Sequence, residues 1–523
     1  MSDWTEGYSS DIGYTSNFYS ELTPRWLVTS AHLMGQHAPD IDRPYTYCEL
    51  GCGQGFGTAL MAAANPLGRF WAIDFNPGQI ANAQRMAVDA ALDNIEFIED
   101  SFQNLADSPT DLCPKFDFMV MHGIYSWVSR ENQLALCRIL LRYLKPGGMV
   151  YISYNCQPGW AQFQAAKKLI KLHAHAHPGR SDKQAVAGLQ YLAAVRDAGA
   201  KAFTSYPDLP KVVDTLSKQD HAYLSHELLH EHWHIHHSSD VARDMASAKL
   251  EFIGSAHLVD NLKQVSLPAK MIPLVEAAAD SMIAETLKDL ARNQNFRRDI
   301  FIRGAVAMGP IEQAGALKRL SFALLREPPP AGEIKFATPL GEAVGKDAVY
   351  RPLLEAMQKG PLSLEEAMSL PAWKDVPRAE LIQAFTLLMA GSFIHPVPHG
   401  AGGGSLRNAD GEGAAARRFN RMVQARGLQG LDYSFLAAPV SGGGVIAQFI
   451  DMMILMTLES QPKLKGVALA DAVLTLMESH GRELLKEGKP FASRDEKIAE
   501  VTARLDVMNA GKFKAWRDLG VMA

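Results

Sequence analysis

A glycine-rich loop near the start of this 523-residue chain constrains its fold more than any other feature. The run Tyr47-Cys-Glu-Leu-Gly51-Cys-Gly-Gln-Gly55-Phe-Gly57 comes directly after an apolar stretch and opens a helical pattern. Glycines there let backbone N–H groups approach a ligand closely, and the N-terminus of a helix favours negative charge. A strand, loop and helix of this kind predict a cofactor-binding α/β domain.

Short apolar runs alternate with helical patterns from residue 46 to about residue 155. Five of these runs are interpreted as strands, at 47–50, 70–73, 95–98, 116–121 and 149–154. The first and fourth are almost wholly apolar, which is typical of strands that are buried on both faces of a parallel sheet. The sequence therefore predicts a parallel α/β sheet in this part of the chain.

Proline and glycine clusters divide the remainder of the chain. Helical spacing dominates from about residue 160 to residue 325, and the proline cluster that follows Arg326 predicts a stiff linker. Three short helical patterns and a strand follow, which suggests a small winged-helix-like piece. We expect five parts, namely an N-terminal lid or substrate segment at 1–45, the α/β domain at 46–220, a helical domain at 221–325, the winged-helix-like domain at 340–398 and a C-terminal helical domain at 414–523.

Composition excludes several classes of protein. Hydrophobic residues make up 47% of the chain and charged residues 21%, so a large core is possible and wholesale disorder is excluded. The formal charge of −5 argues against a chain that mainly wraps a phosphate backbone. The chain shows no signal-peptide pattern, no apolar run long enough to span a bilayer, and five cysteines without regular spacing. We therefore expect a cytoplasmic protein with no nucleic-acid partner and no membrane insertion.

The glycine loop does not match the patterns for dinucleotides or for nucleoside triphosphates. The pattern G-x-G-x-x-G needs a third glycine, and its position falls in turn on Phe56, Thr58 or Leu60. No Gly-Lys-Ser/Thr follows, so the loop is not a Walker loop. Glu49 before the glycines would repel a pyrophosphate, but it suits S-adenosylmethionine, whose methionine end carries an ammonium and whose sulfur is cationic.

Two further acids stand where strands end. Asp74 ends the second strand, where a carboxylate can accept both ribose hydroxyls, and Asp100 ends the third. With these acids in order, E-x-G-x-G-x-G resembles motif I of class I S-adenosylmethionine-dependent methyltransferases, a Rossmann-like fold in which the second acid meets the adenine amino group. The resemblance implies S-adenosylmethionine as cofactor, S-adenosylhomocysteine as product, and a cofactor site formed by Glu49, Gly51, Cys52, Gly53, Gly55, Asp74, Asn76, Gln79, Asp100, Ser101, Phe102, His122 and Gly123.

Other phrases resemble a bacterial group of methyltransferases that carry a methyltransferase regulatory domain. These phrases lie at 7–24, 117–128, 151–160, 223–255 and 296–299, and the match covers roughly residues 1–305. The group includes protein lysine methyltransferases that modify outer-membrane proteins. The resemblance implies a methyltransferase domain, a helical regulatory domain, a winged-helix-like piece and a helical tail, and it suggests a homodimer. It does not fix the substrate.

The loop after the fourth strand faces the transferred methyl group in this fold, so its residues are the expected catalytic ones. It offers His122, Tyr125 and Trp127, and lacks the D/N-P-P-Y/F of enzymes that methylate adenine or glutamine amides. Methyl transfer needs in-line alignment, and an amine acceptor must first lose a proton. Aromatic faces attract cationic amines, so we expect a substrate wall completed by Tyr14, Tyr19, Tyr154 and Trp160. The alternative is that these aromatic residues pack the lid against the sheet.

A histidine-rich segment offers a competing interpretation. His226-Glu-Leu-Leu-His230 spells the H-E-x-x-H zinc motif of metalloproteases, among seven histidines between 221 and 237. No third ligand follows at a family spacing, and the resemblance explains His226 and Glu227 without metal, so we expect no metal site. We therefore expect an S-adenosylmethionine-dependent methyltransferase whose acceptor is a protein lysine. A small-molecule acceptor and a non-catalytic regulatory protein that binds the same cofactor remain alternatives.

Overall fold

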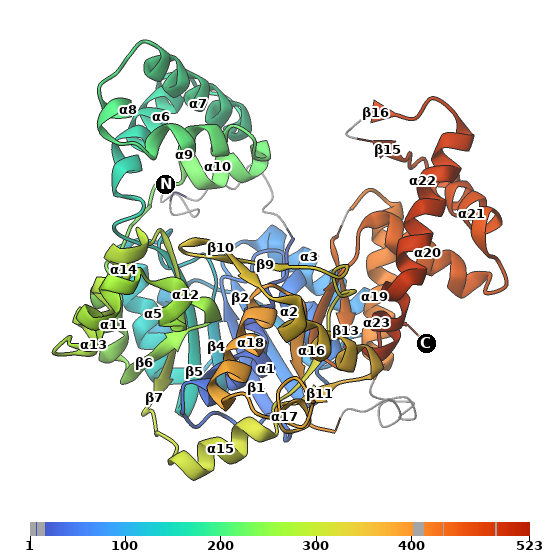
Figure 1. Cartoon of the computed structure of the whole chain (residues 1–523). Coiled ribbons are helices and arrows are strands. Elements are labelled where there is room, and N and C mark those ends of the chain that lie inside the picture. Colours follow the sequence, from blue (N-terminus) through green and yellow to red (C-terminus); the bar gives the residue numbers. More distant parts are fainter. Residues whose placement is uncertain (1–6, 8–15, 401–412, 432, 487–488, 523) are drawn as a thin grey trace.

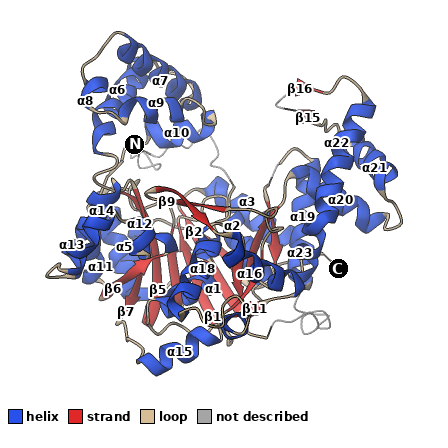
Figure 2. Ribbon diagram, in the orientation of Figure 1, coloured by secondary structure: helices blue, strands red, loops and turns tan. Residues whose placement is uncertain are grey.

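A seven-stranded mixed sheet forms the centre of the computed structural model, which describes residues 7, 16–400, 413–431, 433–486 and 489–522. Five strands are parallel, in the order β3-β2-β1-β4-β5 (Figure 2). They are β1 (Tyr45–Leu50), β2 (Gly68–Asp74), β3 (Ile95–Glu99), β4 (Phe116–Met121) and β5 (Leu144–Asn155). All five strands expected from the sequence are confirmed. The strand order reverses between β1 and β4, which in open α/β sheets marks a ligand-binding crevice.

Two antiparallel strands that the sequence analysis did not predict extend the sheet beyond β5. They are β7 (Phe296–Arg303), which pairs with β5, and β6 (Leu250–Ser255), which pairs with β7. Helical spacing was expected here. The polar positions of β7 do not mark an exposed face, because Arg297 and Asp299 are 5% and 2% exposed and pair with each other. The alternation of buried apolar and exposed polar residues, from which a half-buried strand is recognised, is therefore missing.

Alternate residues of the parallel strands pack into two separate hydrophobic clusters, one on each face of the sheet. Tyr47 and Phe118 face α1 (Pro24–Leu33), α2 (Phe56–Ala64) and α3 (Pro77–Asp89). Cys48 and Met119 face the opposite layer, which holds α4 (Phe102–Asp107), α5 (Arg130–Tyr143) and α11 (Ser238–Ser247). The near-continuous apolar character of the strands follows from this burial on both sides.

A group of helices with its own hydrophobic cluster lies above the sheet in Figure 1. It contains α6 (Gln164–Ala176), α7 (Ser181–Asp197), α8 (Ala202–Ser205), α9 (Leu209–Leu216) and α10 (His221–Leu229). The chain then returns to the side of the sheet and forms α12 (Lys263–Ser266), α13 (Ile272–Glu276) and α14 (Ser281–Arg292). The next helix, α15 (Pro310–Lys318), lies below the sheet in Figure 1.

Where a winged-helix-like piece was expected, the structure has a three-stranded sheet, in the order β11-β8-β12, with three helices. Its elements are β8 (Ser321–Leu324), α16 (Asp347–Lys359), β11 (Leu362–Ser363), α17 (Leu364–Met368), α18 (Arg378–Ala390) and β12 (Ile394–Val397), preceded by the hairpin β9 (Ile334–Thr338) and β10 (Gly341–Gly345). One strand, β8, comes from before the linker rather than from the 340–398 range.

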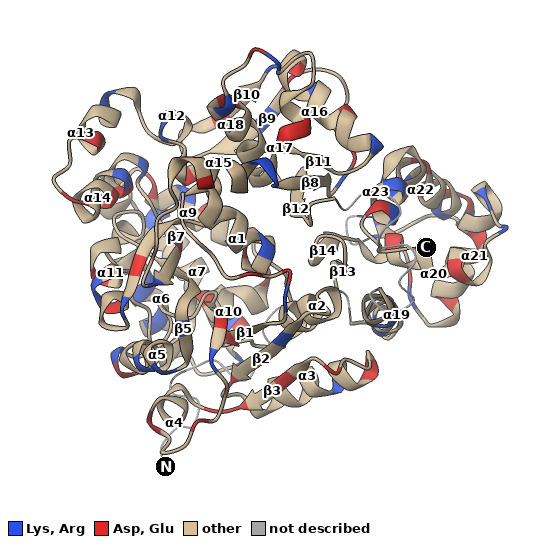
Figure 3. Ribbon diagram, turned by 90° about the horizontal axis from the view of Figure 1, so that it is seen from below, with Lys and Arg blue, Asp and Glu red and all other residues tan. Residues whose placement is uncertain are grey.

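The C-terminal part is mainly helical and shares a hydrophobic cluster with α2 and the sheet. It consists of α19 (Ala414–Leu428), β13 (Phe435–Ala438), β14 (Gly443–Ile446), α20 (Phe449–Ser460), α21 (Gly466–Ser479), β15 (Leu485–Lys486), β16 (Lys489–Pro490), α22 (Arg494–Val507) and α23 (Phe513–Asp518). Basic and acidic residues are interspersed over the elements seen from below in Figure 3. Within the described ranges, no helix combines the length and the apolar character needed to cross a bilayer.

Candidate active site

A cavity of about 560 Å³ lies where β1, β2, β3 and β4 end, beside the point at which the strand order reverses. Its walls come from residues 16–22, the glycine loop, the ends of β2 and β3, the loop after β4, and the end of α10 with the residues that follow it. This volume is in the usual range for small-molecule and cofactor sites. The position is the one that the strand order favours for a ligand.

The glycines of the loop shape one wall of this cavity. Gly51, Gly53 and Gly55 have φ values of 74°, 54° and 69°, which L side chains rarely adopt. A Cβ atom at Gly51 would lie 2.2 Å from Cδ1 of Ile124, and one at Gly55 would lie 2.5 Å from Cε1 of Phe97. The loop can therefore follow this path only with glycine, and its backbone is brought close to the cavity.

Two carboxylates hold the loop in place, from the buried Asp74 and the half-buried Glu49. Asp74 accepts the Gly53 N–H at 2.9 Å and the Asn76 N–H at 3.0 Å, and Glu49 accepts the hydroxyl hydrogen of Thr58. Burial raises the pKa of Glu49 to about 7 and also raises the pKa of Asp74. In the described part of the chain, neither carboxylate forms an ion pair with a basic side chain. A ligand that brings positive charge would stabilise the ionised form of both.

The cavity as a whole is acidic. Its described lining includes no lysine and no arginine, but it includes five carboxylates, from Glu49, Asp74, Glu99, Asp100 and Glu227. Asp100 accepts the Ser101 N–H at 2.8 Å and the side-chain amide of Asn104. A cationic ligand fits this lining better than an anionic one.

All but one of the expected cofactor residues line the cavity. The exception is Asn76, whose side chain accepts the N–H groups of Gly78 and Gln79 and so caps α3. The residues that line it are Glu49, Gly51, Cys52, Gly53, Gly55, Asp74, Gln79, Asp100, Ser101, Phe102, His122 and Gly123.

The loop after β4 brings His122 and Trp127 to the cavity. The His122 ring stacks on Tyr19 at a centroid distance of 3.9 Å, and its Nδ1 lies 2.9 Å from the Tyr151 hydroxyl. Burial lowers the pKa of His122 to about 3, so the ring is neutral near pH 7. Tyr19 and Trp127 both line the cavity.

Three expected acceptor residues do not line the cavity, which corrects the sequence-based placement. The Tyr125 hydroxyl donates to Asp244 at 2.6 Å, and the Tyr154 hydroxyl donates to Asp299 at 2.6 Å. Trp160 packs against Trp233 at 6.0 Å, in the cluster of the helices above the sheet. The two tyrosines therefore stabilise packing, because burying a phenol requires a partner for its hydroxyl. Tyr14 lies outside the described residues.

The far end of the cavity is formed by residues for which the sequence analysis gave no binding role. His226, Glu227, His230 and His232 line it from α10 and the segment after it. Glu227 is half-buried, and burial raises the pKa of its carboxyl, while the nearby Lys167 and the Tyr223 hydroxyl oppose that shift. The H-E-x-x-H motif was the one sequence signal in this segment. It indicated a zinc site and did not indicate that the Glu227 carboxylate lines the cavity.

No group of three or more metal-ligating side chains gathers in the ranges that the structure describes. Burial is the main cause that lowers the pKa of His230 to about 3. A neutral His230 imidazole therefore lines the same end of the cavity as the half-buried carboxylate of Glu227.

Comparison with known proteins places this fold in context. Residues 41–202 match a family model described as "Methyltransferase domain", and residues 220–303 match one described as "Predicted methyltransferase regulatory domain". "Uncharacterized protein sll1526" of Synechocystis is 33% identical over 523 residues, with 99% of both chains covered. "Uncharacterized protein RP789" of Rickettsia prowazekii is 27% identical over 55% of this chain and 51% of its own length.

A solved structure, PKMT2 from Rickettsia typhi in complex with AdoHcy, is similar along nearly the whole chain. The TM-score is 0.69 at 19% identity, and the match covers 96% of this chain and 99% of that one. A second solved structure of PKMT2 from Rickettsia typhi has a TM-score of 0.68 at 18% identity. The two proteins therefore share the α/β sheet and the accessory elements.

Proposed function

This chain belongs to the S-adenosylmethionine-dependent methyltransferases that carry a methyltransferase regulatory domain, and from that premise we propose that it methylates a lysine side chain of a protein. The cofactor is S-adenosylmethionine, and the product is S-adenosylhomocysteine. When bound, the cofactor supplies a methyl group that a nucleophile can displace from a cationic sulfur.

We assign the cofactor to the glycine-loop end of the cavity. The carboxylates of Glu49 and Asp74 lack basic ion-pair partners among the described residues, and this fits a ligand with an ammonium and a sulfonium. Each carboxylate oxygen has two lone pairs, so Asp74 keeps acceptor capacity for hydroxyl groups beyond its backbone hydrogen bonds. Asp100 and Phe102 would then contact the adenine end.

The observation that carries the choice of acceptor is the chemistry of the opposite end. There Glu227 offers a carboxylate, and Tyr19 and Trp127 offer aromatic faces. Burial lowers the pKa of His122 and of His230 to about 3, so both rings are neutral near pH 7. A carboxylate and aromatic faces attract an ammonium, and neutral imidazoles do not repel it. A lysine side chain is long enough and cationic enough to use such a wall.

The side chains at this end would prepare the amine. An ammonium must lose a proton before its nitrogen lone pair can act as a nucleophile, and Glu227 is the carboxylate placed to accept that proton or to pass it to water. Burial raises the pKa of Glu227, which makes it a stronger base than an exposed glutamate. Tyr19 and Trp127 would limit the approach of the amine to the line that displacement requires.

The likeness to PKMT2 from Rickettsia typhi, which was solved in complex with AdoHcy, supports the cofactor part of this proposal through the shared fold. The test is transfer from isotopically labelled cofactor into a lysate of the source cell, followed by peptide mass spectrometry. Methylated lysine in a protein, at a level that is reduced with the Asp74→Ala protein at limiting cofactor, is the expected outcome. Label confined to the small-molecule fraction would favour a free amine acceptor, and binding without transfer would favour a regulatory protein.

A further inference from the structure

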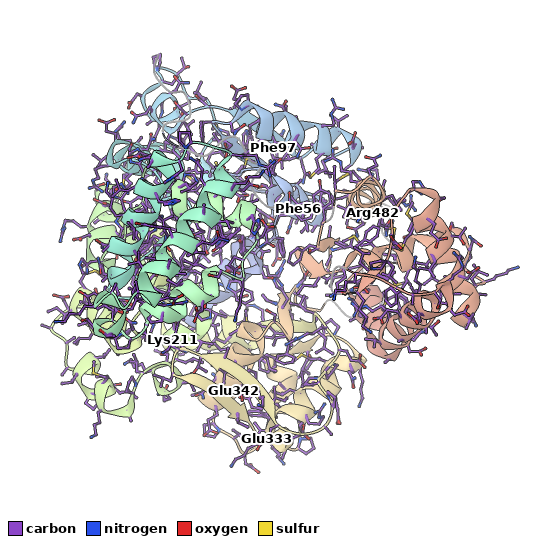
Figure 4. All side chains as sticks on the ribbon, turned by 90° about the horizontal axis from the view of Figure 1, so that it is seen from above. Phe56, Phe97, Lys211, Glu333, Glu342 and Arg482 are labelled. Carbon is purple, nitrogen blue, oxygen red and sulfur yellow. The ribbon has the colours of Figure 1, made fainter. Side chains whose placement is uncertain are left out.

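The C-terminal elements contact the back of residues that line the cofactor cavity. Phe56 is the first residue of α2 and lines the cavity directly after Gly55. Its ring stacks on Tyr433 with a centroid distance of 4.7 Å and an interplanar angle of 17°. In Figure 4, Phe56 lies between Phe97 and the orange ribbon of the C-terminal part.

The hairpin of β13 and β14 presses on a second cavity residue, Phe18. Phe435 meets the Phe18 ring edge-on at 5.5 Å. A Cβ atom at Gly444 would lie 3.1 Å from Cδ1 of Leu60 and 3.2 Å from Cδ1 of Phe18. The hairpin therefore approaches both the N-terminal segment and α2 as closely as a glycine allows.

Polar contacts reach the glycine loop from the same side. The Arg426 guanidinium, on α19, pairs with Asp89 at 2.9 Å and lies 3.4 Å from the Tyr433 hydroxyl. Its Nη1 also lies 3.5 Å from Oδ1 of Asn82, whose amide donates to Oε1 of Gln54 at 2.8 Å. Gln54 belongs to the glycine loop and lines the cavity.

Three cavity residues, Phe18, Gln54 and Phe56, are thus held from behind by one C-terminal unit. A loop rich in glycine loses much conformational freedom when it is ordered, so contacts outside the loop decide how often it has the binding geometry. The apparent dissociation constant is the intrinsic one divided by the fraction of protein in that geometry. The contacts from the C-terminal part should therefore increase the affinity for the cofactor.

We infer that the C-terminal part of the chain is a component of the cofactor site, and that Tyr433 is a positioning residue that sets the affinity for S-adenosylmethionine by holding Phe56. This role depends on the cofactor and not on the identity of the methyl acceptor. A stacked aromatic pair contributes enough that its loss should weaken binding about 2- to 10-fold. Turnover at saturating cofactor should be retained, because Tyr433 does not line the cavity.

The experiment compares three variants of the full chain by calorimetry with S-adenosylhomocysteine and by steady-state kinetics with S-adenosylmethionine. Tyr433→Ala should raise the dissociation constant and KM about 2- to 10-fold, and Tyr433→Phe, which keeps the ring, should stay within about twofold of the wild type. Val473→Ala is the matched control, because Val473 is fully buried in α21 of the same part. It should lower Tm without changing affinity.

Equal affinity in Tyr433→Ala and the wild type would overturn the inference, as would a Val473→Ala protein that loses as much affinity. A measurement on the wild type keeps the test valid if Tyr433→Ala does not fold. Coupling is reciprocal, so S-adenosylhomocysteine should slow hydrogen exchange in β13 and leave exchange in α21 unchanged. Unchanged exchange in β13 would contradict the proposed coupling.

Discussion

The ammonium group of Lys167 lies 4.4 Å from the centre of the Trp127 ring, so a buried lysine stands behind the aromatic wall of the cavity. The same ammonium lies 4.1 Å from the Trp233 ring and donates to the backbone oxygen of Glu227 at 2.6 Å. Burial lowers the pKa of Lys167 well below its ordinary range, against the opposing effect of the Glu227 charge. Lys167 thus joins two residues that line the proposed acceptor end.

Replacing Lys167 with methionine should therefore distinguish a role in positioning Trp127 and Glu227 from a role in the stability of the fold. We expect Lys167→Met to lower kcat/KM for the acceptor about 10- to 100-fold, because Trp127 and Glu227 lose their common partner. Tm should stay unchanged or rise, since removing a buried ammonium also removes its desolvation penalty. Kinetics and a thermal melt on Lys167→Met and on Lys168→Met, whose side chain is exposed, measure both effects. A fall in Tm that accounts for all lost activity would make Lys167 a purely structural residue.

Tyr125 tests the corrected position of a residue that sequence alone assigned to catalysis. Its hydroxyl donates to Asp244, which also pairs with Arg130 at 2.5 Å. Tyr125→Phe leaves a partly buried carboxylate with one donor fewer, so we expect a loss of about 1–3 kcal/mol in the free energy of unfolding. Turnover per folded molecule should not change. A turnover defect of tenfold or more with an unaltered melt would return Tyr125 to the catalytic group.

Glu227 should determine the acid side of the pH profile. Burial raises its carboxyl pKa, and only the ionised carboxylate can accept a proton, so kcat/KM should fall as pH decreases through that raised pKa. Glu227→Gln should lower the plateau about 10²- to 10⁴-fold and remove this acid limb. Glu231→Gln is the control, because Glu231 is exposed and lies four residues after Glu227. It should keep the pH profile of the wild type. An identical acid limb in wild type and Glu227→Gln would assign proton transfer elsewhere.

Glu49 gives a prediction about proton release. Burial raises its pKa to about 7, and a cationic group bound beside it favours the ionised form and lowers that pKa. Binding of S-adenosylhomocysteine should therefore release a proton below about pH 7, and affinity should increase with pH until it levels off above that value. Calorimetry in two buffers with different ionisation heats measures the released proton. In Glu49→Gln the release should vanish, and persistent release there would exclude Glu49 as its source.

The sequence predicted the sheet and the glycine loop because both depend on local patterns. Apolar runs marked the five parallel strands, and positive φ at Gly51, Gly53 and Gly55 explains why the loop needs glycine. The side-chain direction of Tyr125 was not predictable, because sequence gives its loop but not which layer its ring enters. Glu227 and Lys167 were not recognised for another reason. Glu227 lines the cavity, and Lys167 lies behind it, only because the helices above the sheet fold back over the strand ends.

The affinity of Asp74→Ala for S-adenosylhomocysteine, measured by calorimetry, tests most directly the claim that this cavity is the cofactor site. Asp74 accepts two backbone N–H groups that shape the loop, and hydrogen bonds to a charged group contribute about 1.5–3 kcal/mol each. We predict at least a tenfold weaker affinity with the fold intact, while Asp93→Ala, at an exposed position, binds like the wild type. Wild-type affinity in a folded Asp74→Ala protein would contradict the account and place the cofactor outside this cavity.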